Sequence, residues 1–215
     1  MTGPLDAGLD RRRFLLAAGA LGSAGLLGAC SEDSPRPPDS QPAVTRADRL
    51  EGDLSVAALM ASLENLMVAV YDQCLDRQER FGPHPPAALG FFETAQRHHR
   101  EHALAWNSVL TGAGKPGVTG VNLTVKASTT EPGLVRARDY WALLQLAEDV
   151  EGITATTYLH AIGALENNAA IKIAGSIHPV EHEHIGTLSF LLGHNPSSEP
   201  FGRSDGARPI TDSIG

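Results

Sequence analysis

Two segments of the chain place a glutamate and a tyrosine seven residues apart, a spacing that puts both side chains on one face of a helix. Glu64 precedes Tyr71 in the first segment, and Glu151 precedes Tyr158 in the second. A carboxylate is costly in the apolar face of a helix unless a partner satisfies it. The repeated pattern therefore indicates that both glutamates point toward one shared polar site inside a helical protein.

Each of these segments is followed by a stretch that is crowded with His and Glu. His99 and His102 lie three residues apart, as do Glu181 and His184, so the members of each pair can point to the same side of a helix. With the two glutamates of the first pattern they offer six side chains around one axis. Mixed carboxylate and imidazole donors suit Fe or Mn, so we expect a metal site for one or two ions per chain.

The two His-rich stretches also align with each other in a second register. In that register the ligands are His98, Glu101, His178, Glu181 and His182. Pro179 is expected to kink the helix next to His178, which favours the first register. Helix rotation cannot be fixed from sequence to better than one residue, so His98 stays open as an alternative to His99.

Four helical segments are predicted to carry these residues, and they span residues 54–77, 87–110, 132–165 and 168–192. Short connections make the first two antiparallel neighbours, and likewise the last two. Residues 111–131 are predicted to be non-helical, and at roughly 3.3 Å per residue they can run the whole length of a helix. The sequence thus predicts an all-α four-helix bundle of two antiparallel hairpins, with one long crossover and negligible strand content.

The first 29 residues have the features of an export signal. Arg11, Arg12 and Arg13 precede an apolar stretch, a pattern that resembles a twin-arginine signal, and the segment that ends at Cys30 resembles a lipobox. Such signals are cleaved before the cysteine, which then carries a lipid. We therefore expect an extracytoplasmic lipoprotein that is anchored to a membrane through Cys30, with residues 30–53 as a flexible tether.

Residues 54–192 are long enough for one packed domain, and residues 193–215 form a C-terminal tail. The chain has a formal net charge of −8, which argues against nucleic acid or anionic lipid headgroups as partners. Cys74 is the other cysteine, so no internal disulfide is expected in the exported protein, and Cys74 is predicted to be buried.

The same residues carry a resemblance to a known family. Leu63-Glu64 with Tyr71, and Val150-Glu151 with Tyr158, resemble the first and third helices of the ferritin-like superfamily, most closely its exported, desiccation-related branch. Glu181 and His184 match the Glu-x-x-His motif of the fourth helix, and His102 matches the histidine of the second. His99 stands where a Glu is usual, and Met67 where relatives often have a second Glu.

The resemblance implies a ferritin-like bundle with a metal centre of two Fe or Mn ions, whose chemistry with dioxygen or peroxide would protect the cell envelope or handle iron. Tyr71 and Tyr158 are expected to donate hydrogen bonds that orient the carboxylates. The alternative hypothesis is a metal-free helical module that binds an envelope partner or serves a structural role. In either case we expect a monomer or a homodimer, and the sequence leaves open whether the protein is an enzyme.

Overall fold

The computed structural model describes residues 46–81, 86–197 and 200–210. The predicted export signal, Cys30 and the first part of the predicted tether lie outside these residues. The described residues all belong to one compact unit, and they cover nearly all of the predicted packed domain and most of the predicted tail.

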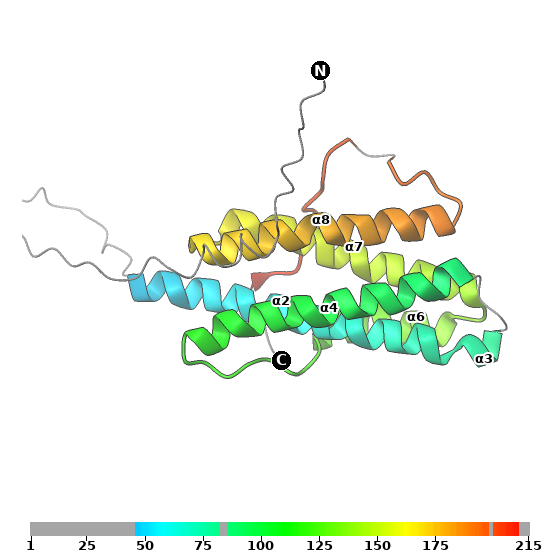
Figure 1. Cartoon of the computed structure of the whole chain (residues 1–215), viewed down its shortest axis with the longest axis horizontal. Helices are drawn as coiled ribbons and strands as arrows, with labels where there is room; N and C mark the ends of the chain where they lie inside the picture. Colours follow the sequence, from blue (N-terminus) through cyan, green and yellow to red (C-terminus); the bar gives the residue numbers. More distant parts are fainter. Residues whose placement is uncertain (1–45, 82–85, 198–199, 211–215) are drawn as a thin grey trace, which may run out of the picture. The chain divides into compact units, whose positions relative to one another are not determined.

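The described residues form helices and contain no β-strand, which confirms the predicted all-α class (Figure 1). The four long helices are α2 (Arg46–Asp76), α4 (Pro86–Gly112), α7 (Tyr140–Ala164) and α8 (Asn168–Leu191). Short helical elements lie between them: α3 (Gln78–Phe81), α5 (Leu123–Val125), the π-helix η1 (Lys126–Thr130) and α6 (Glu131–Arg136). Helix α2 begins earlier than the predicted start at residue 54.

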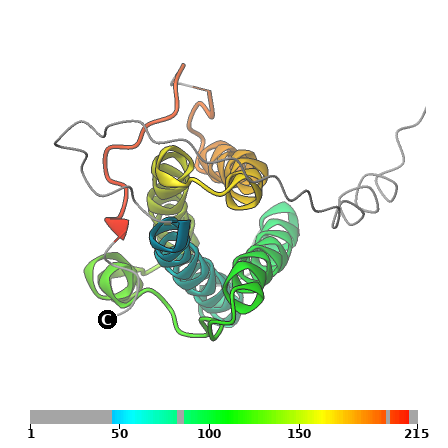
Figure 2. The same ribbon diagram turned by 90° about the vertical axis from the view of Figure 1, so that its left-hand side faces the viewer.

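The four long helices surround a common interior, as Figure 2 shows in a view along their axes. Helix α2 packs mainly against α4, and α7 packs mainly against α8, so the two hairpins are α2–α4 and α7–α8. Helices α2 and α7 also pack against each other across the bundle, whereas α4 and α8 touch more sparsely. This arrangement is the predicted bundle of two hairpins.

Helix α2 is the central element of the core. It is buried on nearly every side from Leu54 to Cys74, including Leu59, Leu63 and Leu66. A helix that is apolar all round needs to be enclosed by protein or lipid. Residues 52–76 are long and apolar enough to cross a membrane, but most of this stretch is covered by the other helices, as expected of a core helix.

The connection between the hairpins differs from the prediction, because its second half is helical. Its first half is irregular and runs alongside α2, where the Asn122 backbone N–H donates to the Ser62 backbone carbonyl at 2.9 Å. The Asn122 side chain then caps α5 by accepting from the Val125 N–H at 3.0 Å, and Val125 is buried. This cap and the buried valine start the helical run α5–η1–α6.

The predicted third helix, residues 132–165, is divided into α6 and α7. Ala137 is extended, and Asp139 is the N-cap of α7, where its carboxylate accepts from the Ala142 N–H at 2.9 Å. Helix α6 lies so close to α7 that a Cβ on Gly133 would come within 2.4 Å of the Leu146 side chain. The chain therefore turns before α7, and α6 packs against it as a separate element.

Polar contacts fix the turn between α7 and α8. The buried carboxylate of Asp53, on α2, accepts from the backbone N–H groups of Glu166 at 3.0 Å and Asn167 at 2.6 Å. Asn167 in turn caps α8. Helix α8 continues through Pro179. The tail beyond α8 lies against α7, where the backbone N–H of Arg208 donates to the Thr157 hydroxyl at 3.0 Å.

Candidate metal centre

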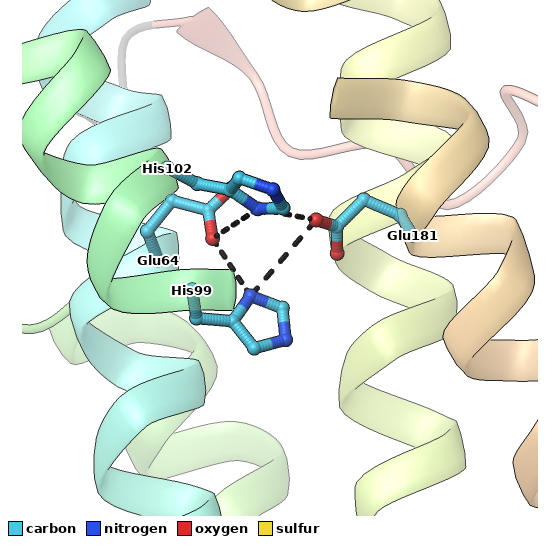
Figure 3. Close-up of side chains that lie close together, drawn as sticks. All are labelled: Glu64, His99, His102 and Glu181. Carbon is cyan, nitrogen blue, oxygen red and sulfur yellow. Dashed lines mark hydrogen bonds and ion pairs between the residues drawn. The ribbon is translucent and has the colours of Figure 1, made fainter. Parts of the chain in front are cut away.

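The structure brings together the six residues of the first predicted register. Glu64 comes from α2, Glu151 from α7, and two residues each come from α4 and α8. Five of the six are buried, and His102 is the one that reaches partway to the surface. Figure 3 shows Glu64, His99, His102 and Glu181 pointing toward one another between the helices. All four long helices thus supply polar side chains to one interior point.

His99 lies between the two glutamates that begin the pattern. Its Nδ1 is 2.7 Å from Oε2 of Glu64, and its Nε2 is 3.0 Å from Oε1 of Glu151. The ring is fully buried. Since the two nitrogens lie on opposite edges of one imidazole, His99 connects the carboxylates of α2 and α7 across the centre.

Two tyrosines also donate hydrogen bonds to these carboxylates. Tyr71 donates to Oε1 of Glu151 at 2.6 Å, and Tyr158 donates a short hydrogen bond to Oε1 of Glu64. The Tyr158 hydroxyl also accepts from the Trp106 indole N–H at 2.7 Å. Trp106 is not among the predicted site residues, but it lies four residues after His102, a helical spacing that places it on the same side of α4.

Several buried polar atoms of the cluster have no hydrogen-bond partner among the described residues. They are His102 Nδ1, His184 Nδ1, Glu151 Oε2 and both carboxylate oxygens of Glu181. Yet His102 Nδ1 lies 2.9 Å from Glu181 Oε1, and His184 Nδ1 lies 3.2 Å from Glu151 Oε1. These atoms are close without being aligned for a hydrogen bond, an arrangement that suits donors directed at a common ion. Each unsatisfied group otherwise costs about 1–3 kcal/mol.

The donor atoms form two overlapping groups, each with its atoms within 4.8 Å of one another. One group consists of Glu64, His99, His102 and Glu181, and the other of His99, Glu151, Glu181 and His184. His99 and Glu181 belong to both. The residues present therefore fit a site for two metal ions with shared ligands, and oxygen and imidazole donors of this kind suit Fe, Mn or Zn.

The electrostatics of the cluster are strongly perturbed. Burial alone would raise the pKa of Glu151, but the positive charges of His99 and His184 outweigh it and hold this pKa well below its usual range. For Glu64, the neighbouring imidazoles of His102 and His99 likewise overcome burial and lower the pKa. Burial lowers the pKa of His99, but the charges of Glu151 and Glu181 raise it well above the ordinary value. The His99 imidazolium thus balances carboxylate charge when no metal does.

Glu181 behaves differently from the other two carboxylates. Burial and the negative charge of Glu64 raise the pKa of Glu181 well above its ordinary value. Burial and the nearby carboxylates also raise the pKa values of Tyr71 and Tyr158 well above the ordinary value, so both tyrosines stay protonated donors. With Glu181 protonated, two buried carboxylates remain ionised, and a divalent cation would let all three carboxyl groups be ionised at one point.

The residues of the second predicted register lie outside this cluster, with the exception of Glu181, which both registers share. His98 is half-buried beside it, and its Nδ1 is 3.0 Å from Nε2 of His184. Glu101 is exposed and pairs with Arg97 at 3.4 Å. His178 and His182 approach each other on another face of α8, with their Nε2 atoms 3.2 Å apart.

The comparisons with known proteins agree with this geometry. A family model described as a ferritin-like domain matches residues 52–194, which include all four long helices apart from the start of α2. Neither the search of curated proteins nor the search of solved structures returned a match.

Proposed function

Because the chain belongs to the ferritin-like domain family, we propose that its buried carboxylate and histidine cluster is a centre for two Fe or Mn ions in an exported, lipid-anchored envelope protein. The observation that carries this proposal is Glu181, a fully buried glutamate with neither carboxylate oxygen in a hydrogen bond among the described residues. Such a group is costly to keep unless it has a ligand to bind.

The two overlapping groups assign the ligands. Glu64 and His102 would serve one ion, and Glu151 and His184 would serve the other, while Glu181 belongs to both groups. His99 also belongs to both, but a neutral imidazole has one free lone pair, so His99 would serve one ion or the other. Bound Fe(II) or Mn(II) supplies the capacity to react with dioxygen or peroxide. The chemistry of the donors does not choose between Fe and Mn, since both accept carboxylate and imidazole ligands.

The protein's own contribution is to orient the ligands and to restrict access. Tyr71 and Tyr158 each donate to one oxygen of a terminal carboxylate and so orient it. The second oxygen of Glu151 has no hydrogen bond among the described residues, whereas that of Glu64 lies 2.7 Å from His99 Nδ1. Glu64, Glu151 and Glu181 are fully buried, so large substrates cannot reach the centre directly. This favours small reactants such as dioxygen or peroxide, and therefore an oxidative or iron-handling role.

The location in the envelope rests on the sequence. Arg11–Arg13 and Cys30 support export by a twin-arginine signal and a lipid anchor. The net charge of −8 argues against a nucleic-acid partner, and we expect a monomer or a homodimer. In a Cys30→Ala variant we expect the protein to leave the membrane fraction and to lose incorporation of radiolabelled fatty acid. A variant that remains labelled in the membrane would contradict the anchor.

A second candidate function is the metal-free helical module. The observation that favours it is His99, which already hydrogen-bonds both Glu64 and Glu151 and can balance their charge as an imidazolium. Under this alternative the cluster joins the two hairpins and has a structural role.

Metal content separates the two functions. The full chain, expressed with added iron or manganese, should carry one or two ions, and Glu181→Ala should reduce that content sharply. Glu183→Ala is the matched control, because Glu183 lies on the same helix but is exposed, and it should leave the content unchanged. Wild-type chain without bound metal under both conditions would support the metal-free module.

A further inference from the structure

We propose that His178 and His182 form a second metal site on the outer face of α8, one that binds a divalent ion of the zinc, nickel or copper type through two imidazole nitrogens. The two residues lie one turn apart on the helix, and their side chains converge beside the C-terminal segment. The site is independent of the proposed function, because it shares no residue with the six ligands of the buried cluster.

The two rings face each other through their Nε2 edges. Their centroids are 4.6 Å apart and their planes are inclined by 75°, whereas the Nε2 atoms are 3.2 Å apart. The nitrogens are therefore the parts of the two rings that approach each other. This is the arrangement in which both lone pairs can be directed at one ion.

The separation of the nitrogens matches the size of a metal coordination shell. A zinc–imidazole bond is about 2.0–2.1 Å long, and two ligands of a tetrahedral ion at that distance lie about 3.3–3.4 Å from each other. The observed 3.2 Å is close to that value. An ion could thus bind both rings with little movement of either side chain.

A pocket of about 430 Å³ adjoins the pair and leaves room for the remaining ligands. It is lined by α7, α8 and the C-terminal segment, including Thr156, Ser189 and Phe201. The segment lies close over His182, since a Cβ on Gly202 would be 3.9 Å from its Nε2. Water or a small coordinating anion could complete the shell from this side.

The donor chemistry distinguishes this site from the buried one. The cluster in the bundle offers three carboxylates with its histidines, whereas the outer pair offers imidazole alone. Neutral imidazole favours zinc, nickel and copper, and carboxylate-rich sites favour manganese and iron. The two sites therefore differ in metal preference, although zinc suits both.

The direct test uses the full chain with labelled histidine, titrated with Zn²⁺ alone and followed by the ring-nitrogen resonances. Single His178→Ala and His182→Ala variants assign the two signals. We expect the Nε2 resonances of both residues to shift together over one Zn²⁺ equivalent beyond any that the buried cluster takes. If neither shifts at saturating Zn²⁺, or only one does, the pair shares a hydrogen bond and the proposal is wrong.

Affinity provides the second readout. His182→Ala should weaken zinc binding at this site by about tenfold or more, equivalent to about 1.4 kcal/mol. His160→Ala, which removes an exposed histidine from α7, is the matched control and should have no effect. Equal zinc affinity in the wild type and His182→Ala would also overturn the proposal. Loss of bound iron or manganese in the Glu181→Ala variant tests the buried site and has no bearing on the His178–His182 site.

Discussion

The hydroxyl of Tyr71 on α2 donates a 2.6 Å hydrogen bond to Oε1 of Glu151 on α7. The reciprocal bond runs from Tyr158 on α7 to Glu64 on α2. Each glutamate is thus held by the tyrosine of the other hairpin, and this crossed pairing requires the two helices to be antiparallel. The orientation of the carboxylates therefore depends on both hairpins being in register.

Removing one of these hydroxyls should weaken metal binding without removing a ligand. For Tyr71→Phe we expect affinity for Fe(II) or Mn(II) to fall by about 10–100-fold, the usual effect of losing a partner that orients a ligand. Isothermal titration of the metal-free full chain measures this, and circular dichroism checks that the helices persist. Unchanged affinity in both Tyr71→Phe and Tyr158→Phe would show that the tyrosines have only a packing role.

Replacing His99 by glutamate should make the fold more dependent on metal. His99→Glu substitutes a fourth buried carboxylate for the imidazole that now lies between Glu64 and Glu151, so the metal-free variant should unfold at a lower temperature than the wild type. Added Mn(II) should raise its melting temperature by more than it raises that of the wild type, since binding stabilises only the folded state.

The control for this variant is His160→Glu, which adds the same charge at an exposed position of α7. It should show neither the lower melting temperature nor the larger response to Mn(II). An equal response to Mn(II) in wild type, His99→Glu and His160→Glu would contradict the role given to His99 and favour the metal-free module.

The raised pKa of Glu181 predicts a pH dependence of stability in the metal-free chain. A carboxyl whose folded pKa exceeds its unfolded value contributes stability below about pH 4.5 that is lost as the pH rises toward the folded pKa. Glu181→Gln removes this titration, so its stability relative to the wild type should grow with pH above about 4.5. Urea unfolding in the presence of a chelator, at about pH 5 and about pH 8, measures the difference. A difference that shrinks with rising pH would contradict the assignment.

Cys74 should be inert in the folded protein. It is fully buried, and burial raises the pKa of its thiol to about 12. Reaction with a thiol reagent should be undetectable in the native chain and complete in denaturant. Rapid modification under native conditions, in a Cys30→Ala background, would mean that α2 is not enclosed as the structure shows.

Much of the fold follows from patterns of residue type and spacing. The seven-residue spacing of Glu64 and Tyr71, repeated at Glu151 and Tyr158, identified two helices with one buried polar face. The pairs of ligands spaced by three residues placed the other donors, and the structure brings these six side chains together. Their role as metal ligands remains a prediction.

Other features depended on contacts that spacing alone does not reveal. The division of the third helix at Ala137 depends on a local cap by Asp139 and on the close packing of α6 against α7. The rotation of α4 about its own axis determines whether His98 or His99 faces the interior, and this rotation is fixed by the packing of the whole helix. The approach of His178 to His182 was visible as a spacing, but the pocket beside them is formed by residues of the distant C-terminal segment.

The most direct test of the metal centre is a crystal of the full chain grown with Mn(II), with diffraction recorded at the manganese absorption edge. We predict anomalous density within bonding distance of Glu181, flanked by Glu64 and His102 on one side and Glu151 and His184 on the other. No density at this point, with His99 still hydrogen-bonded to both Glu64 and Glu151, would contradict it.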